Sequence, residues 1–273
     1  MVMRTKTALI AVYGTLRKGQ GNHHLLAHAS FVGHAKTVAC MAMRCTQIPF
    51  VSQAQQVSQI AVELYEVGPA VLARIDALEG YIPSAPERSW YQRIQVEVED
   101  AAGQVRLACL YVNESDGELV PHGDFTRRRT LPAASADWYF AYGSNMNPER
   151  MTGRGVYFNA RLAGVLPNHR LAYNKQGNSG QLFANADRAE GQQCRGLLYR
   201  LDRAGLRRLD GCEGAPVHYV RERRSIEVPG GSAVEAWVYF ATPAKITCEG
   251  TPSAAYRSHL LRGRDVWGEV LQV

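Results

Sequence analysis

The chain has 273 residues, of which 46% are hydrophobic and 21% are charged. These are the proportions of an ordinary globular protein, so they argue against an intrinsically disordered chain and against a fibrous repeat, and the length predicts two domains. The net charge of +6 is not gathered into basic clusters interleaved with aromatic residues, so a nucleic-acid-binding protein is not expected either.

The sequence predicts a protein that neither enters nor crosses a membrane. No apolar run approaches the ~18 residues that a spanning helix needs. The first residues contain Arg4 and Lys6 and lack the small-residue cleavage site of a signal peptide. We therefore expect a cytoplasmic location. The six cysteines form no C-x-x-C pair and no zinc-ligand spacing, so no zinc site is expected among them.

The elements of the first half follow one another in a clear order. An apolar run, Thr7–Val12, predicts a strand that ends at Tyr13-Gly14-Thr15. Further along, the patterns predict a loop leading into a short helix near His23-His24, a strand over Ile60–Val67, a helix over Val71–Leu78 that ends near Glu79-Gly80, and a strand over Arg93–Val98.

The second half repeats this order. Ile60–Gly80 aligns without a gap with Cys194–Gly214, and eight of the columns are identical. Ordinary composition would give about one or two identities in such a window. The turn at Tyr142-Gly143-Ser144, the Tyr219-x-Arg221 pair and a late Tyr239 also have counterparts in the first half, which are Tyr13-Gly14-Thr15, Tyr91-x-Arg93 and Tyr111. The chain is therefore a tandem duplication.

Strands outnumber helices in both copies, so each copy is expected to be an α+β domain around a small barrel or rolled sheet. The segment Arg127–Ala136 contains Pro132 and several small residues, which is typical of a boundary. We expect a first domain over residues 1–128, a linker over 129–136 and a second domain over 137–273.

The Tyr-Gly-Thr/Ser turn is a candidate anion site. Glycine permits a sharp turn that brings successive backbone N–H groups to one side. Such a concavity binds a carboxylate or a phosphate, and Thr15 or Ser144 would add a hydroxyl. A single turn of this kind is usually only a turn, but here it occurs twice.

The second candidate is Asp-x-x-Glu-Gly, at Asp76–Gly80 and again at Asp210–Gly214. A glutamate at a helix end against apolar neighbours has its charged form disfavoured, which raises its pKa toward that of a general base. The alternative is a solvent-facing carboxylate beside a capping glycine. The recurrence of the motif at a similar distance after each turn favours a shared pocket.

Both halves resemble the γ-glutamylcyclotransferase superfamily. The first, with VYGTLRKGQGNHHLL, LEGY and YQR, is most similar to the γ-glutamylamine cyclotransferase and AIG2-like branch. The second, with FAYGSNM, LDGCEG and PSAAYRSHLL, is more similar to γ-glutamylcyclotransferase proper, and the tandem arrangement resembles BtrG-like proteins. The resemblance implies two domains, each a six-stranded mixed β-barrel with flanking helices, one pocket apiece and no cofactor.

The resemblance also implies the reaction and the residues. The substrate would be a small γ-glutamyl amide that cyclises to 5-oxoproline, with Glu79 and Glu213 as catalytic acid/bases. The head group would be held by the two turns and by two tyrosines, namely Tyr13, Gly14, Thr15, Leu16 and Tyr91 in the first copy, and Tyr142, Gly143, Ser144, Asn145, Met146 and Tyr219 in the second. Tyr111 and Tyr239 would either line the pockets or lie in the core.

Three alternatives remain beside this interpretation. A serine hydrolase would use Ser144 or Ser179, but no G-x-S-x-G elbow is present. A binding module of the same fold, or a protein with one active copy, would keep the glutamates without turnover at both sites. The pair His23-His24 and the basic residues Arg221, Arg223 and Arg224 would contact anionic groups of a substrate or lie in solvent.

The first copy has a longer segment after its glutamate, YIPSAPERSWY. A longer loop beside the base reshapes the leaving-group side of the pocket, so we expect the two sites to prefer different leaving amines. The identity of the leaving group, the oligomeric state and the activity of each copy are left open by the sequence.

Overall fold

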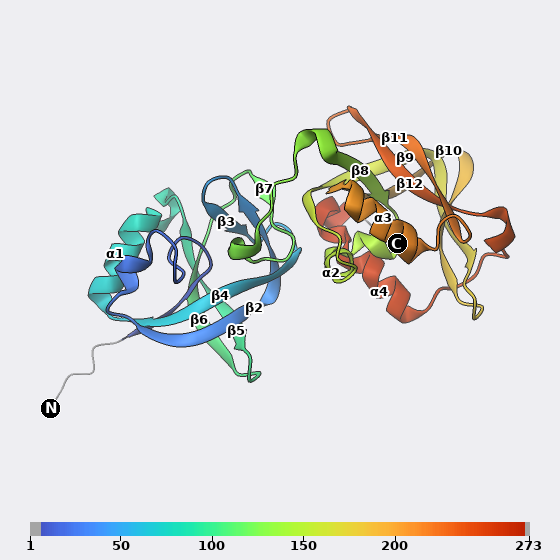
Figure 1. Ribbon diagram of the computed structural model, residues 1–273. Helices are drawn as coiled ribbons and strands as arrows, with labels where there is room; N and C mark the ends of the chain where they lie inside the picture. Colours follow the sequence, from blue (N-terminus) through green and yellow to red (C-terminus); the bar gives the residue numbers. More distant parts are fainter. Residues whose placement is uncertain (1–6, 271–273) are drawn as a thin grey trace. The chain divides into compact units, whose positions relative to one another are not determined.

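The computed structural model describes residues 7–270 and divides into two compact units, Met1–Arg129 and Thr130–Val273. Each unit consists mostly of strands with a few short helices (Figure 1). No helix among residues 7–270 has the length and apolar character needed to cross a membrane.

Five strands of the first unit form a closed ring: β1 (Ala8–Val12), β2 (Ser30–Cys45), β4 (Ser58–Val67), β5 (Gln92–Asp100) and β6 (Val105–Val112). They follow one another in the order β2-β4-β1-β6-β5, and β5 pairs back with β2. The pair β1–β6 is parallel and the other pairs are antiparallel, so the expected mixed barrel is confirmed.

The ring closes with five strands rather than the expected six, and β2 also pairs with two short strands outside the ring. Its pairing with β4 shifts register between Lys36 and Cys40, and such a bulge bends a strand. The part of β2 before the shift pairs with β4 and β5. After the shift, Cys40 and Met41 still pair with β4, and the last residues of β2 continue beyond the ring to pair with β3 (Pro49–Ser52) and β7 (Glu118–Leu119).

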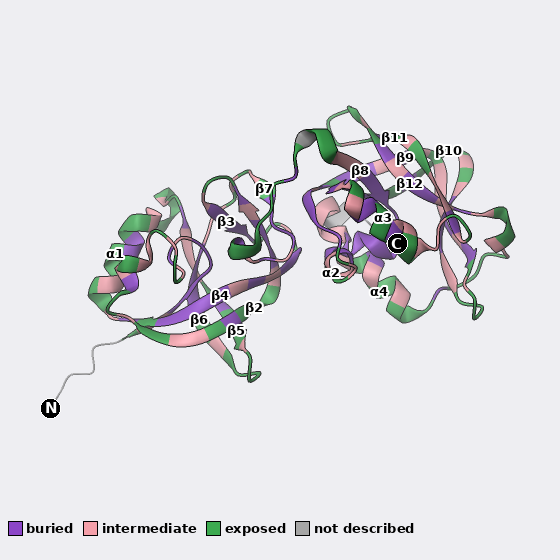
Figure 2. Ribbon diagram, viewed as in Figure 1, coloured by how far each residue is buried: buried purple, intermediate pink, exposed green. Residues whose placement is uncertain are grey.

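One α-helix, α1 (Pro69–Glu79), packs against this barrel, and only Ile75 and Asp76 on it are buried (Figure 2). Pro69 opens the helix, where its missing N–H costs nothing. Gly80 ends it with a left-handed φ of 62° that favours glycine. The N–H of Tyr81 closes the last turn by donating to the carbonyl oxygen of Asp76 at 2.8 Å. Glu79 is therefore the last helical residue.

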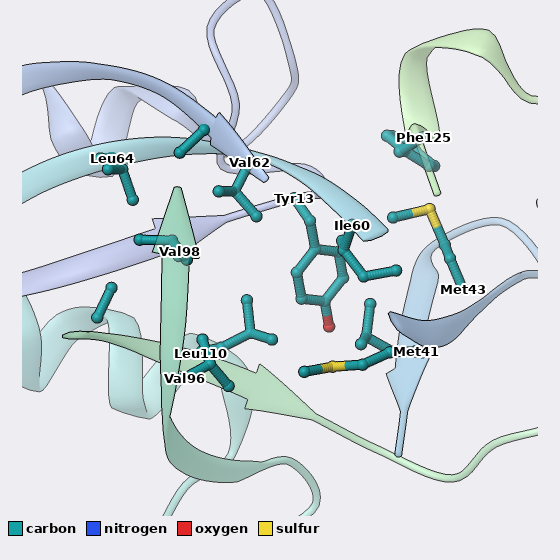
Figure 3. Close-up of a cluster of buried hydrophobic side chains, with 14 of the residues drawn as sticks. Tyr13, Met41, Met43, Ile60, Val62, Leu64, Val96, Val98, Leu110 and Phe125 are labelled. Atoms are coloured by element: carbon teal, nitrogen blue, oxygen red, sulfur yellow. The ribbon is translucent and has the colours of Figure 1, made fainter. Parts of the chain in front are cut away.

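The interior of the first barrel is filled by aliphatic and sulfur-containing side chains. Tyr13, which directly follows β1, lies among Met41, Ile60 and Leu110 (Figure 3). Three short 3-10 helices complete the unit: η1 (His23–Leu26), η2 (Pro86–Arg88) and η3 (Phe125–Arg127).

The second unit is a closed barrel in the order β10-β8-β12-β11-β9. Its strands are β8 (Ala136–Ala141), β9 (Phe158–Gln176), β10 (Leu182–Asp202), β11 (Tyr219–Glu227) and β12 (Ala233–Ala241). The pair β8–β12 is parallel, which matches β1–β6 of the first unit.

The helices of the second unit are α2 (Pro148–Gly153), α3 (Arg203–Glu213) and α4 (Ala254–Arg262), with the 3-10 turns η4 (Ala133–Ser135), η5 (Ser144–Met146), η6 (Pro243–Lys245) and η7 (Arg264–Val270). Helix α3 ends as α1 does. Gly214 has a φ of 62°, and the N–H of Ala215 donates to the carbonyl oxygen of Asp210 at 2.9 Å. Glu213 is thus the last residue of its helix as well, so the same helix end presents a glutamate in both copies.

Candidate active site

The first unit contains a cavity of about 190 Å³ at one end of its barrel. The turn after β1 forms one wall and the end of α1 another, which brings Glu79 to the residues of the glycine turn. All first-copy residues predicted from the sequence line it, and the lining is completed by Ala11, Val12, Asn22, Ile48, Pro49, Leu78, Trp90 and Tyr111. Two segments far apart in the chain thus meet at one pocket.

The turn that follows β1 requires glycine. A Cβ on Gly14 would lie 2.5 Å from Cγ of Pro49, too close for any larger residue without a shift of Pro49. The N–H of Arg17 donates to the carbonyl oxygen of Gly14 at 3.1 Å. Within residues 7–270, the N–H groups of Thr15 and Leu16 have no acceptor. Two backbone donors are therefore available to an anionic or carbonyl oxygen in the cavity.

Glu79 is half-buried, and its carboxyl group has no hydrogen-bond donor or cation as partner in the part of the chain that the structure describes. Burial raises its pKa from 4.5 to about 7. A carboxyl group with such a pKa accepts and returns a proton near neutral pH, as a general acid/base must.

The raised pKa has a consequence for stability. The pKa is about 7 in the folded state and near 4.5 in the unfolded state, so the native state holds a proton that the unfolded state has lost. Glu79 therefore costs stability as the pH rises from 4.5 to 7, by up to about 3 kcal/mol.

Glu79→Gln is accordingly expected to stabilise the protein above pH 7 and to have little effect near pH 5. The free energy of unfolding from urea denaturation at pH 5 and pH 8.5 measures this, with the exposed Glu87→Gln as the control. Equal stability differences at the two pH values would show that Glu79 titrates normally.

The tyrosines of the first site are fixed by the protein itself. The hydroxyl of Tyr13 donates to the carbonyl oxygen of Tyr111 at 2.8 Å, and that of Tyr91 donates to the carbonyl oxygen of Pro49 at 2.9 Å. The Tyr111 hydroxyl donates to Oδ1 of Asp76 at 2.6 Å. These rings line the cavity while their hydroxyl groups hold its walls together.

Asp76 is the residue behind this arrangement that the sequence interpretation left without a role. It is 7% exposed, and Nη1 of Arg93 donates to both of its oxygens at 2.7 Å. The network joins α1, β5 and β6, and so it fixes the helix end that carries Glu79. Its signal in the sequence was the recurrence of all three residues in the second copy, as Asp210, Arg221 and Tyr239.

The second copy reproduces this network. The hydroxyl of Tyr239 donates to Oδ1 of Asp210 at 2.7 Å, and Arg221 lies 3.2 Å from Oδ2 of the same aspartate. Tyr142 donates to the carbonyl oxygen of Tyr239, and Tyr219 donates to that of Ala184 at 2.7 Å. The equivalent tyrosine hydroxyls therefore hold equivalent walls.

The cavity beside Glu213 is much smaller, about 30 Å³. Nη1 of Arg154 lies 2.6 Å from Oε1 of Glu213, and Nδ2 of Asn145 donates to the same oxygen at 3.0 Å. Glu213 is therefore ion-paired, unlike Glu79. Arg154 had not been identified from the sequence.

Helix α4 helps to make the cavity beside Glu213 small, because its Tyr256 is one of the lining residues. The hydroxyl of Tyr256 accepts a hydrogen bond from the N–H of Ala184 at 3.1 Å. It also lies against the glycine turn, where a Cβ on Gly143 would be only 2.8 Å from it. The lining includes the predicted residues of the second copy except Met146, which is buried and whose carbonyl oxygen accepts from the Tyr199 hydroxyl at 2.8 Å.

The basic residues considered as anion contacts are engaged elsewhere. Arg221 pairs with Asp210, Arg223 with Asp137 at 2.6 Å, and Arg224 with Glu222. His23 and His24 contact backbone carbonyl oxygens of their own loop through Nδ1. Within residues 7–270, no group of three or more His, Cys, Asp or Glu side chains is arranged to hold a metal ion.

Several known proteins that are similar to this chain are named as γ-glutamylcyclotransferases. A protein of Methanocaldococcus jannaschii with a provisional γ-glutamylcyclotransferase name is 40% identical over 118 residues, covering 42% of this chain and 93% of the relative. The butirosin cyclotransferase of Niallia circulans, named for γ-L-glutamyl-butirosin B, is 32% identical over 108 residues, covering 40% and 68%.

A Bacillus subtilis protein, also provisionally named a γ-glutamylcyclotransferase, is 26% identical over 271 residues, 95% of this chain and 92% of the relative. Its crystal structure aligns with a TM-score of 0.44 at 24% identity, over 96% of this chain and 93% of that one. The family model described as "Gamma-glutamyl cyclotransferase, AIG2-like" matches residues 10–127 and again residues 139–258. The chain therefore belongs to the AIG2-like γ-glutamyl cyclotransferase family and carries two copies of its domain.

Proposed function

We propose that the protein converts γ-glutamyl amides into 5-oxoproline and a free amine, and that Glu79 is the acid/base of the first site. The observation that carries this proposal is the arrangement at the first cavity. A desolvated and unpaired carboxyl group shares a pocket of about 190 Å³ with a turn that presents open N–H donors.

The reaction needs little beyond these groups. The substrate supplies its own nucleophile, because its α-amine reaches the γ-carbonyl carbon by closing a five-membered ring. A pocket that holds the substrate folded makes this attack intramolecular, which is worth several powers of ten in rate. The N–H groups of Thr15 and Leu16 would receive an oxygen of the substrate, either of its α-carboxylate or of the carbonyl that becomes an oxyanion.

Glu79 would carry the proton. It first takes a proton from the α-ammonium group, so that the nitrogen lone pair can attack the γ-carbonyl carbon. The tetrahedral intermediate then collapses with cleavage of the original C–N bond, and Glu79 returns this proton to the leaving nitrogen. The ring nitrogen still carries a second proton, which Glu79 passes to the amine in the same way. Atoms and charge balance without water, and the products are 5-oxoproline and the amine as its ammonium ion.

The lining of the first site supports an apolar or aromatic leaving amine. Ile48, Leu78 and Trp90 line the same cavity as Glu79, and Trp90 and Leu78 are 55% and 38% exposed. Trp90 belongs to the longer segment that follows Glu79 in this copy. An apolar amine would cover these side chains and remove their surface from water.

The pH dependence of the first site tests this proposal. In a Glu213→Gln variant, we expect the rate of 5-oxoproline release from an apolar γ-glutamyl amide to rise with pH and to reach half its maximum near pH 7, because Glu79 must be ionised to accept the proton. Initial rates between pH 5 and 9 give this profile. A rate that is flat from pH 5.5 to 8.5 would remove Glu79 from the role of base.

The second candidate function is a protein in which only the first site is active, and the structure of the second site favours it. The glutamate of that site is ion-paired with Arg154, and the Tyr256 hydroxyl lies against its turn. We propose that this site turns over only when a substrate draws Arg154 from Glu213 and displaces the Tyr256 hydroxyl from the turn.

A further inference from the structure

A groove of about 430 Å³ lies beside Glu213, and the charge of its lining residues differs from that of the first site. It shares Ser144, Glu213, Tyr219 and Tyr256 with the small cavity, so the two spaces are continuous at these side chains. Three cationic side chains line it, Arg150, Arg154 and Lys175, and Glu213 is its one acidic lining residue. In the first site, by contrast, Glu79 is the one charged lining residue.

Lys175 is the unusual member of this groove. It is 5% exposed, and within residues 7–270 its Nζ forms no ion pair with a carboxylate, since Glu213 acts on it only as a more distant charge. Nζ lies 4.9 Å from the ring centre of Phe183 and 5.0 Å from that of Tyr219. Aromatic faces stabilise an ammonium group only in part, and a buried charge without an anion in contact is costly. An anionic ligand in the groove would remove that cost.

Arg150 adds a second cation of the same kind. Its Nη1 contacts Nε2 of His259 at 3.4 Å, and its Nε is buried without a hydrogen-bond partner. Arg154 is already matched by Glu213, at 2.6 Å. The groove therefore holds two cations, Arg150 and Lys175, in excess of its one carboxylate.

We propose that this groove is a leaving-group subsite for a dianionic amine, and that Lys175 determines this specificity. The inference rests on the proposed function. The ligand class is a γ-glutamyl compound whose leaving amine carries two acidic charges, as in a dicarboxylic amino acid. Its anionic groups would meet Lys175 and Arg150 and would compete with Glu213 for Arg154, which frees the base only when such a substrate is bound. The two sites then divide apolar and acidic leaving groups between them.

The test uses the full chain with Glu79→Gln, so that only the second site can turn over. Four probes are compared by kcat/KM for 5-oxoproline release: γ-glutamyl-glutamate, γ-glutamyl-alanine, γ-glutamyl-phosphoethanolamine and γ-glutamyl-methylamide. We expect γ-glutamyl-glutamate to exceed γ-glutamyl-alanine at least tenfold. A preference for the phosphate compound instead would show that the dianion is a phosphate and not a pair of carboxylates.

Lys175→Met, which keeps an unbranched apolar side chain, is expected to reduce the glutamate-to-alanine ratio of kcat/KM to near one. Lys36→Met is the matched control, because Lys36 is exposed and belongs to the first unit, and there the ratio should stay within twofold of the parent. Arg150→Met is a second variant in case Lys175→Met fails to fold, which thermal denaturation would reveal. A ratio that is unchanged in folded Lys175→Met and Arg150→Met would overturn the inference.

Binding separates this inference from the proposed function. Calorimetry with γ-glutamyl-glutamate and the Glu79→Gln/Glu213→Gln double variant needs no turnover. Binding to the double variant that weakens at least tenfold with Lys175→Met, together with no 5-oxoproline from any probe in the Glu79→Gln enzyme that keeps Glu213, would support the subsite and overturn the cyclotransferase proposal at this site. Turnover without a preference for the dianionic leaving group would support the cyclotransferase proposal and overturn the subsite. No detectable binding of γ-glutamyl-glutamate would also overturn the subsite.

Discussion

Glu79→Gln is expected to lower 5-oxoproline release at the first site by about 10²- to 10⁴-fold, the usual contribution of a general acid/base. Glutamine fills the same space and accepts hydrogen bonds, but it cannot take the proton from the α-ammonium group. Because the carboxyl group of Glu79 has no ion-pair partner among the described residues, its replacement leaves no charge unmatched. The loss should therefore fall on kcat rather than on folding.

The measurement is made in a Glu213→Gln background with an apolar γ-glutamyl amide, so that the second site does not contribute. Glu87→Gln is the control, since Glu87 is exposed and lies in the segment that follows α1. A Glu79→Gln enzyme that keeps more than a tenth of the parent's kcat would contradict the assignment of Glu79 as the base.

The second large effect is expected from Asp76→Ala, at about 3 kcal/mol of lost stability in the first unit. The substitution leaves Arg93 and Tyr111 without their common acceptor, and removing one partner of a buried ion pair is strongly destabilising. The corresponding change in the second copy, Asp210→Ala, should cost only about 1 kcal/mol, because the Asp210 side chain is 30% exposed and its contact with Arg221 is longer, at 3.2 Å.

Native-state hydrogen exchange read on peptides from α1 and α3 would measure the opening free energy of each unit separately. We expect Asp76→Ala to affect the α1 peptides and Asp210→Ala to affect the α3 peptides less. Equal and small losses in the two units would show that the network does not hold the helix ends. Since α1 carries Glu79, Asp76→Ala should also lower the first site's kcat.

Much of the fold followed from the repeat. The aligned segments around Glu79 and Glu213 predicted the same helix in both copies, and the left-handed glycines that end α1 and α3 are where the motif placed them. The sequence interpretation expected six strands in each barrel, whereas each ring closes with five. The number of strands in a ring depends on which strands pair, and the pattern along one strand does not specify its partners. The bulge between Lys36 and Cys40 of β2 has no distinctive residue pattern, and it is settled by which strands lie on either side.

The site could be predicted only in part. The glycine turns and the glutamates belong to motifs with a chemical reason for each residue, and they line common cavities. The ion pair of Asp76 with Arg93 and the pairing of Arg154 with Glu213 depend on side chains that meet across elements. Spacing along the chain does not specify such contacts. Tyr256 lay in a recognised motif, yet only the position of α4 brings its hydroxyl to the glycine turn.

A γ-glutamyl amide should cyclise on this protein rather than be hydrolysed. Product analysis by mass spectrometry, after incubation of the purified protein with an apolar γ-glutamyl amide, distinguishes the two reactions directly. We expect 5-oxoproline and free amine in a one-to-one ratio, with no incorporation of oxygen from ¹⁸O-water. Glutamate labelled with ¹⁸O in place of 5-oxoproline would contradict this mechanism.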